Sequence, residues 1–429
     1  MTHRLLSTLL QLLARAYLRR YSPMIIAITG NVGKTTTKEA VAVVVGSKYT
    51  TRATGGNLNN ELGIPLTILG DFSERYYRTG GTMRFWMQVL WRGFVGLFSN
   101  ASYPEILILE FGADRPGDIE RLTKTYPPHI AIITHVGDVP VHVEFFASPR
   151  ELAREKAHLI EYLAPTDTAI LGSDDLTVLE MRSRTKGRVR TFGLGDGADV
   201  RVTSLRPRLD GVRPLGIAFD VEVERHSMPA TISGALGAGL ARASAAAVAV
   251  GMSLDIGLAT AVEALARMSV PAGRMRIIEG IRSTIIIDDT YNASPAAMHS
   301  AIDTVRGLPA TRHVLVLGDM RELGSYSVQA HQAIGTLAAE VADVLVCVGQ
   351  QGAVIADAAA NQMPTEHIHR AQDSHEAAAM VQQLLRTGDL VLVKGSQGMR
   401  MEFIVQEIMA RPEQASKVLV RQSELWLKK

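Results

Sequence analysis

A strand–turn–helix pattern at residues 24–45 constrains the fold more than any other stretch of the sequence. β-forming residues occupy 24–29, the turn Gly30-Asn-Val-Gly33 follows, and a helical pattern opens at Lys34. Glycines in such a turn let backbone N–H groups close on phosphate oxygens, and the helix N-terminus adds partial positive charge. The usual motif has a further glycine where this chain has Ile28, so the stretch is a narrower variant of a phosphate-binding loop.

The residue types of this loop predict the task of each side chain. Lys34 reaches the outer phosphates of a nucleotide such as ATP, and the Thr35 hydroxyl can bind Mg²⁺. The predicted nucleotide-binding residues of the loop are Thr29, Gly30, Asn31, Gly33, Lys34, Thr35 and Thr36.

Length and composition describe an ordinary globular protein of roughly two to three domains. The 429 residues are 47% hydrophobic and 21% charged, and the net charge of +2 favours neither nucleic acid nor an acidic partner. The single cysteine, Cys347, excludes a disulfide within the chain and fits a reducing compartment, so we expect a cytoplasmic protein. No run reaches the roughly 18 apolar residues that a membrane-spanning helix needs.

Short apolar strands alternate with helical stretches along most of the chain. They end in polar residues, as at Glu110 after the run 106–109. Such alternation predicts an α/β fold with a mostly parallel, doubly wound sheet, whose ligands bind beyond the carboxyl ends of the strands. Residues 200–233 instead read as an antiparallel extension, and an alanine-rich helical pair follows at 234–266.

A second, Rossmann-like α/β domain is predicted after a boundary at 271–274. Its apolar strands are expected at 284–287, 314–317, 344–348 and 390–393. No G-x-G-x-x-G follows any of them, so dinucleotide binding is unsupported. The predicted domains are an N-terminal helix at 1–23, a central phosphate-loop domain at 24–272 and a C-terminal domain at 273–429.

Two segments combine apolar and basic residues. Residues 1–20 predict an amphipathic helix. Its apolar face consists of Leu5, Leu6, Leu9, Leu10, Leu13, Ala16 and Tyr17. An insertion at 72–103 interleaves aromatic residues with arginines and has no acidic residue between Glu74 and Glu105. Each segment either packs on the body of the protein or makes a peripheral contact with a membrane. Packing is the simpler interpretation of the first segment, and the two interpretations are equal for the second.

Six motifs follow one another along the chain. They are Thr29-Gly-Asn-Val-Gly-Lys-Thr-Thr-Thr-Lys-Glu39, Gly56-Asn-Leu-Asn-Asn-Glu-Leu-Gly-Ile-Pro65, Glu110-Phe-Gly-Ala113, Asp288-Asp-Thr-Tyr-Asn-Ala-Ser-Pro295, Leu317-Gly-Asp-Met-Arg-Glu-Leu-Gly324 and Val393-Lys-Gly-Ser-Gln-Gly-Met-Arg-Met-Glu402. In this order they resemble the motifs of the Mur ligase superfamily, and most closely its branch that adds D-alanyl-D-alanine to a UDP-N-acetylmuramoyl tripeptide. A single match would be weak, but six collinear matches argue against chance.

The resemblance implies an ATP- and Mg²⁺-dependent ligase of peptidoglycan synthesis, with a muramoyl peptide and D-Ala-D-Ala as substrates. A substrate carboxylate attacks the γ-phosphate of ATP, and an incoming amine then displaces phosphate from the acyl phosphate to form an amide. Lys34 would stabilise the β- and γ-phosphates, and Thr35, Glu110 and His142 would hold Mg²⁺. Lys156 matches a lysine that several members carry as a carbamate near a second metal, so Lys34, Glu110, His142 and Lys156 are the expected catalytic residues.

The remaining expected contacts follow from the same resemblance and from a polar, glycine-rich loop at 53–63 that offers donors and acceptors. Arg274 is expected to contact a nucleotide phosphate, and the ribose and adenine contacts are expected from Asp289, Tyr291 and Asn292. The incoming amine is expected at Lys394 and Ser396. The polar loop is expected to contact substrate through Asn57, Asn59 and Asn60.

The chain departs from the family pattern in four places, one of which is the loop 138–141 ahead of His142, which is longer than usual. Family members carry an N-terminal domain that grips the UDP-sugar, whereas residues 1–23 precede the expected strand here. The family's G-x-H-N-x-x-N-A signature falls at 234–241 without its histidine and asparagines, and the segment 72–103 is an insertion. Two alternatives therefore stay open: a Mur-type ligase for another acid, polyglutamate-like or lipid-linked, and a non-catalytic, membrane-associated homologue.

Overall fold

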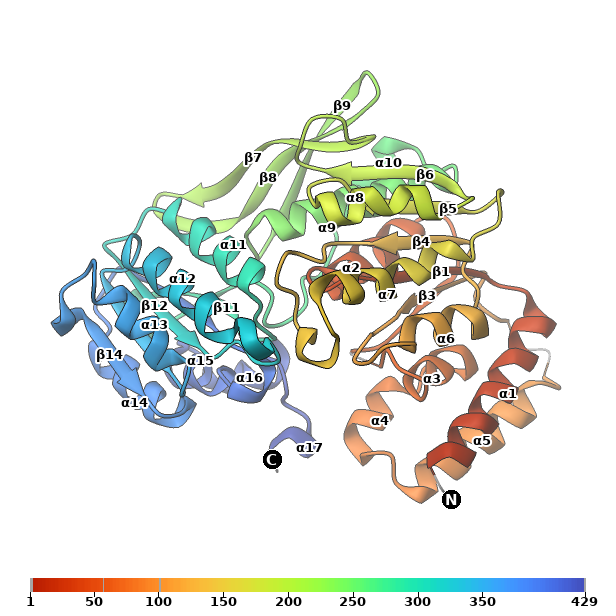
Figure 1. Cartoon of the computed structure of the whole chain (residues 1–429), viewed down its shortest axis with the longest axis horizontal. Coiled ribbons are helices and arrows are strands. Elements are labelled where there is room, and N and C mark those ends of the chain that lie inside the picture. The colour runs from red at the N-terminus through yellow and green to blue at the C-terminus, as the bar shows by residue number, and fades with distance from the viewer. Residues whose placement is uncertain (1–2, 57, 100–101, 428–429) are drawn as a thin grey trace.

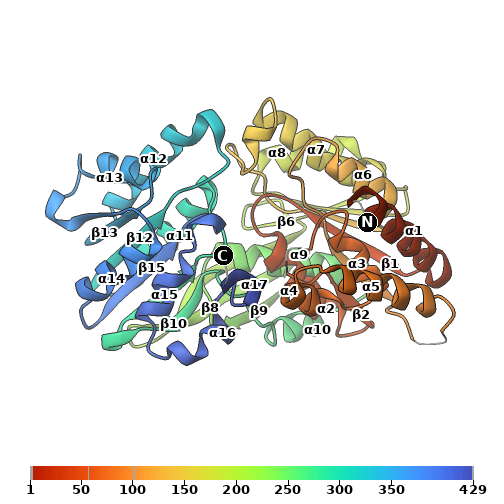
Figure 2. The ribbon, with the colours of Figure 1, turned by 90° about the horizontal axis from the view of Figure 1, so that it is seen from below.

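The computed structural model describes residues 3–56, 58–99 and 102–427, which form two α/β units side by side (Figure 1). Within these residues, each unit is built on one sheet, and the two sheets have nine and six strands. Helices cover the faces of both sheets (Figures 1 and 2). The predicted fold class, a doubly wound phosphate-loop domain followed by a Rossmann-like domain, is confirmed.

The strands of the first sheet are β1 (Met24–Thr29), β2 (Thr51–Ala53), β3 (Ile106–Glu110), β4 (Ile130–Ile133), β5 (Thr168–Gly172), β6 (Arg188–Gly193), β7 (Val200–Asp210), β8 (Arg213–Val223) and β9 (His226–Ser233). Those of the second are β10 (Arg276–Glu279), β11 (Ile285–Asp289), β12 (Arg312–Gly318), β13 (Val344–Val348), β14 (Ile368–Ala371) and β15 (Asp389–Lys394).

The helices of the first unit are α1 (His3–Tyr21), α2 (Lys34–Val45), α3 (Gly63–Leu69), α4 (Ser73–Thr79), α5 (Met83–Gly96), α6 (Asp118–Thr125), α7 (Pro149–Glu161), α8 (Leu176–Glu180), α9 (Ala238–Ser253) and α10 (Leu258–Leu265). Those of the second are α11 (Pro295–Arg306), α12 (Ser327–Ala339), α13 (Gly352–Ala359), α14 (Ser374–Leu384), α15 (Glu402–Ile408), α16 (Ala415–Val418) and α17 (Glu424–Leu427).

The first sheet is parallel over most of its width. Its strand order is β2-β3-β1-β4-β5-β6-β7-β8-β9, and the pairs are parallel as far as β7. The last three strands pair antiparallel, which confirms the extension predicted for residues 200–233. The alanine-rich pair α9 and α10 follows it, also as predicted.

Strand β1 lies near the middle of this sheet and is buried on both faces. Ile26 and Ile28 point into the core that includes α2 and α9, whereas Ile25 and Ala27 point into the core that includes α1, α3, α6 and α7. Burial on both faces explains why the sequence of β1 is a continuous apolar run rather than an alternating one. The phosphate loop therefore begins from a rigid strand.

The second sheet has the order β10-β11-β15-β12-β13-β14, and only β10 among these strands runs antiparallel to its neighbour. Strands β11 and β15 are paired so that Asp289 lies beside Lys394. The polar residues that follow these two apolar strands in the sequence thus meet at one edge of the sheet.

The N-terminal helix α1 packs on α3 and α5. Leu6, Leu10 and Ala14 are buried, but Leu5 and Leu9, which the sequence placed on the packed face, are exposed. The apolar face predicted for α1 was too broad, because only a narrow stripe of residues spaced three to four apart is buried. No helix among the described residues is long and apolar enough to cross a membrane.

The two units touch at several points that are distant in sequence. His142 Nδ1 in the first unit lies 2.5 Å from Glu322 Oε2 in the second. The chain then returns to the first unit at its end, where α17 contacts α4 (Figure 2). The first contact joins the loop after β4 to the loop after β12, so residues beyond the carboxyl ends of strands in both sheets meet there.

Candidate active site

The phosphate loop is a tight turn between β1 and α2. Gly33 caps the helix with φ of +89°, a conformation that only glycine adopts without strain. A Cβ atom at Gly30 would overlap the Thr134 hydroxyl, so glycine is also required there for space. At the start of α2, the N–H groups of Lys34, Thr35 and Thr36 have no carbonyl of their own helix to bind. They are the donors that an anion at this helix N-terminus would use.

Strand β4 and the residues after it hold the other side of the loop. The N–H groups of Asn31 and Val32 both donate to the His135 carbonyl, over 2.7 and 3.2 Å. The Asn31 amide donates to the Val136 carbonyl, and the Thr134 hydroxyl donates to the Val32 carbonyl. Asn31, a predicted nucleotide contact, thus uses its side chain to fix the loop.

Glu110 lies beside the loop because β3 pairs with β1, with Glu110 opposite Ile28. Its carboxylate accepts a hydrogen bond from the Thr35 hydroxyl at 3.2 Å on one oxygen and from the Asn59 amide at 3.2 Å on the other. Glu110 is 2% exposed. The structure therefore brings together three predicted residues: Thr35, Glu110 and Asn59.

The other two asparagines of the polar loop are placed differently. The Asn60 side-chain Oδ1 accepts hydrogen bonds from the N–H groups of Leu62 and Gly63, so this side chain fixes the turn that leads into α3. Asn57, also predicted as a substrate contact, lies outside the described residues.

Two lysines converge on the phosphate loop. Lys34 Nζ donates to the Gly30 carbonyl at 2.8 Å, and Lys156 Nζ, from α7, donates to the same oxygen at 3.3 Å. Burial lowers the pKa of Lys34, against the opposing effect of the Glu110 carboxylate. Burial, and then the positive charge of Lys34, holds the pKa of Lys156 well below its usual range.

His142 contacts carboxylates other than Glu110. It has φ of +70° at the start of the short 3-10 helix η1 (Val143–Phe145), and its Nδ1 pairs with Glu322. Its Nε2 lies 3.8 Å from Asp114 Oδ1. The hydrogen bond from His142 lowers the pKa of the Glu322 carboxyl. His142 thus stands at the contact between the units, and Thr35 and Glu110 are the two predicted magnesium ligands that touch each other.

Arg274 reaches from the second unit toward the phosphate loop. Its Nη2 lies 3.4 Å from the Thr35 hydroxyl, and its guanidinium stacks 4.0 Å above the ring centre of Tyr291. The Nε atom of Arg274 is buried and has no hydrogen-bond partner among the described residues. Burial raises the pKa of Tyr291, so the ring is neutral beneath the guanidinium. A buried cationic donor without a partner fits an anionic ligand, such as a phosphate, at this point.

The remaining predicted residues of the second unit form one connected cluster. Lys394 Nζ pairs with Asp289 Oδ2 at 2.6 Å and donates to the Asn292 carbonyl at 2.9 Å. The Asn292 side-chain oxygen accepts from the Gln397 N–H. Ser396 is buried and its hydroxyl accepts from the Arg321 N–H. These residues fix the loops at the edge of the second sheet, close to Tyr291.

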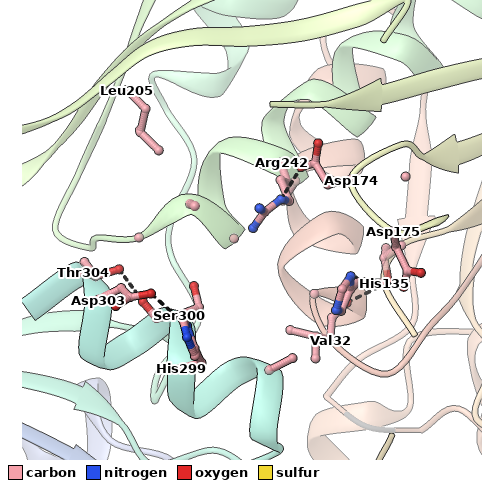
Figure 3. A pocket seen from close by; sticks show the side chains of 18 of the residues that line it. Val32, His135, Asp174, Asp175, Leu205, Arg242, His299, Ser300, Asp303 and Thr304 are labelled. Atoms are coloured by element: carbon pink, nitrogen blue, oxygen red, sulfur yellow. Dashed lines mark hydrogen bonds and ion pairs between the residues drawn. The ribbon is translucent and has the colours of Figure 1, made fainter. Parts of the chain in front are cut away.

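A cavity of about 810 Å³ opens between the units directly beside the phosphate loop (Figure 3). Val32 and Gly33 of the loop line one side, and α11 of the second unit lines another. Apolar side chains of β6–β8 and of the loop before α9, among them Phe192, Ile217 and Leu236, form much of the wall. The cavity therefore continues from the phosphate loop into an apolar space of a size suited to a small ligand.

The polar residues of this cavity were not predicted as functional. Arg242 Nε pairs with Asp174 Oδ2 at 2.5 Å, and His135 Nδ1 lies 3.2 Å from Asp175 Oδ2 (Figure 3). His299 of α11 faces them from the second unit. Asp174 and Asp175 follow strand β5, and polar residues after a buried strand were the signal that could have found them.

The residues present fit a magnesium–nucleotide ligand. A threonine hydroxyl and a carboxylate supply the oxygen ligands that Mg²⁺ prefers. Lys34, the start of α2 and the Arg274 guanidinium surround the same place with positive charge. Fold and site together define an α/β protein of the phosphate-loop, nucleotide-binding class.

Comparisons with known proteins agree with this class. Residues 97–237 match the Mur ligase middle domain, and residues 273–397 match the Mur ligase glutamate ligase domain. Together the two matches span more than half of the chain. The chain therefore belongs to the Mur ligase family and is an ATP-dependent acid–amino acid ligase.

Individual relatives cover nearly the whole chain. The UDP-N-acetylmuramoyl-tripeptide–D-alanyl-D-alanine ligase of Bacillus subtilis is 29% identical over 94% of this chain and 80% of its own length. The crystal structure of the MurF ligase from Thermotoga maritima in complex with ADP superposes with a TM-score of 0.77 at 26% identity, over 95% of this chain and 84% of that one. A MurF structure from Acinetobacter baumannii gives 0.74 at 27% identity, over 92% and 79%.

Proposed function

We propose that this chain joins D-alanyl-D-alanine to a carboxylate of a UDP-N-acetylmuramoyl tripeptide, with ATP and Mg²⁺. The activity named for the Bacillus subtilis relative supports the two substrates. The contact between the loops that follow β4 and β12 supports a reaction between the two substrates, because ligands of parallel sheets bind beyond the carboxyl ends of the strands.

In the first step a carboxylate oxygen of the acid forms a bond to the γ-phosphorus, and the bond from that phosphorus to the β-phosphate oxygen breaks. ADP leaves and an acyl phosphate remains. Lys34 and Arg274 lie where they would neutralise the charge that spreads over the phosphates. Thr35 and Glu110 would hold Mg²⁺, which would supply further positive charge to neutralise the phosphates.

In the second step the amine of D-Ala-D-Ala attacks the acyl carbon, inorganic phosphate leaves and the amine gives up a proton. We assign the amine side to the edge of the second sheet around Lys394 and Ser396, and the acid side to the loop that carries Asn59. The ion pair between Lys394 and Asp289 keeps that edge ordered. Contact between the units would exclude water from the acyl phosphate.

We assign the nucleoside to the cavity between the units. The cavity begins at Gly33, where the phosphates would end, and its apolar wall suits a purine base. Arg242 directly follows the segment 234–241, where the family's histidine–asparagine signature is missing, and it pairs with Asp174. Polar contacts to the base would then come from this pair and from His299, rather than from the cluster around Asp289.

The observation that carries the proposal is the approach of Arg274 to Thr35 from the other unit, because a phosphate at the loop would then be contacted from both halves of the chain. The test is phosphate release from ATP with UDP-N-acetylmuramoyl tripeptide, with and without D-Ala-D-Ala. We expect release to require both substrates, and the variant Lys34→Met to show none above background. If phosphate is released with another acid but not with the muramoyl tripeptide, the proposed substrate is wrong, although the chain would still be a ligase.

A further inference from the structure

Helices α1 and α5 carry apolar side chains that no part of the described structure covers. Trp91 is 65% exposed and Phe98 is 71% exposed, unusually high values for aromatic residues. The exposed apolar residues of these two helices and the turn after α5 are Leu5, Leu9, Leu12, Met83, Met87, Trp91, Phe94, Val95 and Phe98. We call this set the α1–α5 surface.

The exposed residues form stripes at helical spacing. On α5 they recur every three to four residues, while Phe85, Trp86 and Val89 on the opposite face are buried. The two helices pack closely because Gly93 and Gly96 leave room: a Cβ atom at Gly93 would lie 3.5 Å from Leu13 of α1. Both helices also contact α3 beneath them. Their outward stripes therefore lie next to each other on one side of the molecule.

The charges on the two helices are all of one sign. α1 and α5 contain no aspartate or glutamate. Their arginines are Arg4, Arg15, Arg19 and Arg20 on α1, and Arg84 and Arg92 on α5, and the side chains of all six are exposed. An exposed apolar stripe flanked by arginines is complementary to a surface that is negatively charged outside and apolar inside.

We propose that the α1–α5 surface docks on an anionic lipid bilayer. The exposed aromatic rings enter the boundary between head groups and acyl chains, and the arginines pair with lipid phosphates. Exposed aromatic rings beside arginines, with no acidic residue on either helix, match a bilayer, because its negatively charged head groups lie directly over an apolar interior. The inference concerns location and is independent of which acid the enzyme activates.

The position of this surface suits such docking. In both views α1 and α5 lie at the end of the molecule opposite α12, α13 and α14 (Figures 1 and 2). The cavity between the units lies away from them, so a bilayer under α1 and α5 leaves the candidate active site open to soluble substrates.

The first experiment is co-sedimentation of the full chain with vesicles. Vesicles of phosphatidylglycerol and phosphatidylcholine should pellet the protein, and pure phosphatidylcholine vesicles should pellet much less. The double variant Trp91→Ser/Phe94→Ser should weaken the partition at least about tenfold, since two large apolar groups are lost. Arg84→Gln/Arg92→Gln should weaken it roughly 30-fold, at a contribution of roughly fivefold for each arginine.

Matched controls use exposed residues elsewhere in the chain. Val212→Ser/Val328→Ser removes two exposed apolar groups, and Arg225→Gln/Arg267→Gln removes two exposed charges; neither should change the partition. Trp86 is left in place because it is 7% exposed and its removal would test folding. If the control variants lose as much vesicle binding as the α1–α5 variants, the proposal is wrong.

The second experiment reads the position of one side chain. Brominated acyl chains quench tryptophan only at short range, and Trp91 is the tryptophan that lies on the α1–α5 surface. Wild-type fluorescence should be quenched in anionic brominated vesicles, and Trp91→Phe should lose most of that quenching while still pelleting. If instead sedimentation without lipid shows a dimer that Trp91→Ser/Phe94→Ser dissociates, the surface binds a second copy and the proposal is wrong.

Discussion

Lys34 and Lys156 donate to the same backbone oxygen, that of Gly30, over 2.8 and 3.3 Å. Burial lowers the pKa of both lysines. The pKa of Lys156 is lowered further by the positive charge of Lys34. Lys34 retains a stabilising carboxylate, Glu110, and would gain phosphate oxygens when a nucleotide binds. Lys156 is the group that more readily loses its proton.

The first prediction is that Lys156 reacts with CO₂. A neutral amine adds to CO₂ and releases a proton, so the product carries a negative charge beside Lys34 in place of a second positive one. ¹³C-NMR of protein equilibrated with ¹³C-bicarbonate should show a carbamate signal that Lys156→Arg lacks. Activity of Lys156→Ala should fall at least about tenfold and recover partly with added formate. Full activity of Lys156→Arg would contradict this role.

The second prediction concerns the magnesium requirement. Glu110 contacts Thr35 and is buried, so its carboxylate is the charged ligand that this site offers. Glu110→Gln should keep the shape and the hydrogen bond from Asn59 but raise the Mg²⁺ concentration for half-maximal activity by at least about tenfold. Glu105→Gln, a substitution of the exposed glutamate just before β3, is the matched control. An unchanged Mg²⁺ dependence in Glu110→Gln would exclude the carboxylate as a ligand.

The third prediction concerns the contact between the units. Arg274→Ala removes a guanidinium from the vicinity of Thr35 and from the face of Tyr291. Loss of a charge-assisted contact of about 2 kcal/mol should lower kcat/KM for ATP roughly 30-fold. Arg274→Lys should retain part of the kcat/KM for ATP, and the surface substitution Arg267→Ala should leave it unchanged. Wild-type kinetics in Arg274→Ala would show that this residue does not contact the nucleotide.

The fourth prediction concerns pH and stability. Burial raises the pKa of Asp288 to about 6, above its usual value, although hydrogen bonds from Thr290 and the Gly273 N–H oppose the effect. Between about pH 4 and pH 6 the folded protein therefore binds a proton that the unfolded chain releases, so this group makes stability fall as pH rises through that window.

Asp288→Asn removes this dependence. Relative to wild type, the variant should gain up to about 3 kcal/mol in unfolding free energy between pH 4 and pH 7, measured by urea denaturation at each pH. The same comparison for the surface substitution Asp210→Asn serves as the control. A difference between Asp288→Asn and wild type that stays constant with pH would contradict the raised pKa.

The sequence was sufficient for the fold because the strongest signals are local. Apolar strands buried on both faces, such as β1 and β3, read as unbroken runs, and the loop after β1 has glycines where Gly33 must adopt a positive φ. The pairing of β1 with β3 then brings Glu110 to Thr35, as expected from polar residues at the ends of parallel strands.

What the sequence could not supply is the partner of each polar side chain. A motif specifies a residue type, but the side chain of Asn31 fixes the phosphate loop and that of Asn60 fixes the turn before α3. His142 pairs with Glu322, nearly two hundred residues away, and the cavity joins Asp174, Arg242 and His299 from three distant elements. Such pairings depend on how the two units pack, which no local pattern encodes.

The most direct test of the acyl-phosphate mechanism is the transfer of an oxygen atom. UDP-N-acetylmuramoyl tripeptide labelled with ¹⁸O in its carboxylates is incubated with ATP, Mg²⁺ and D-Ala-D-Ala, and the inorganic phosphate is analysed by mass spectrometry. The mechanism predicts one ¹⁸O atom in each phosphate released with amide formation, because the attacking carboxylate oxygen leaves with phosphorus. Amide formation with unlabelled phosphate would contradict it.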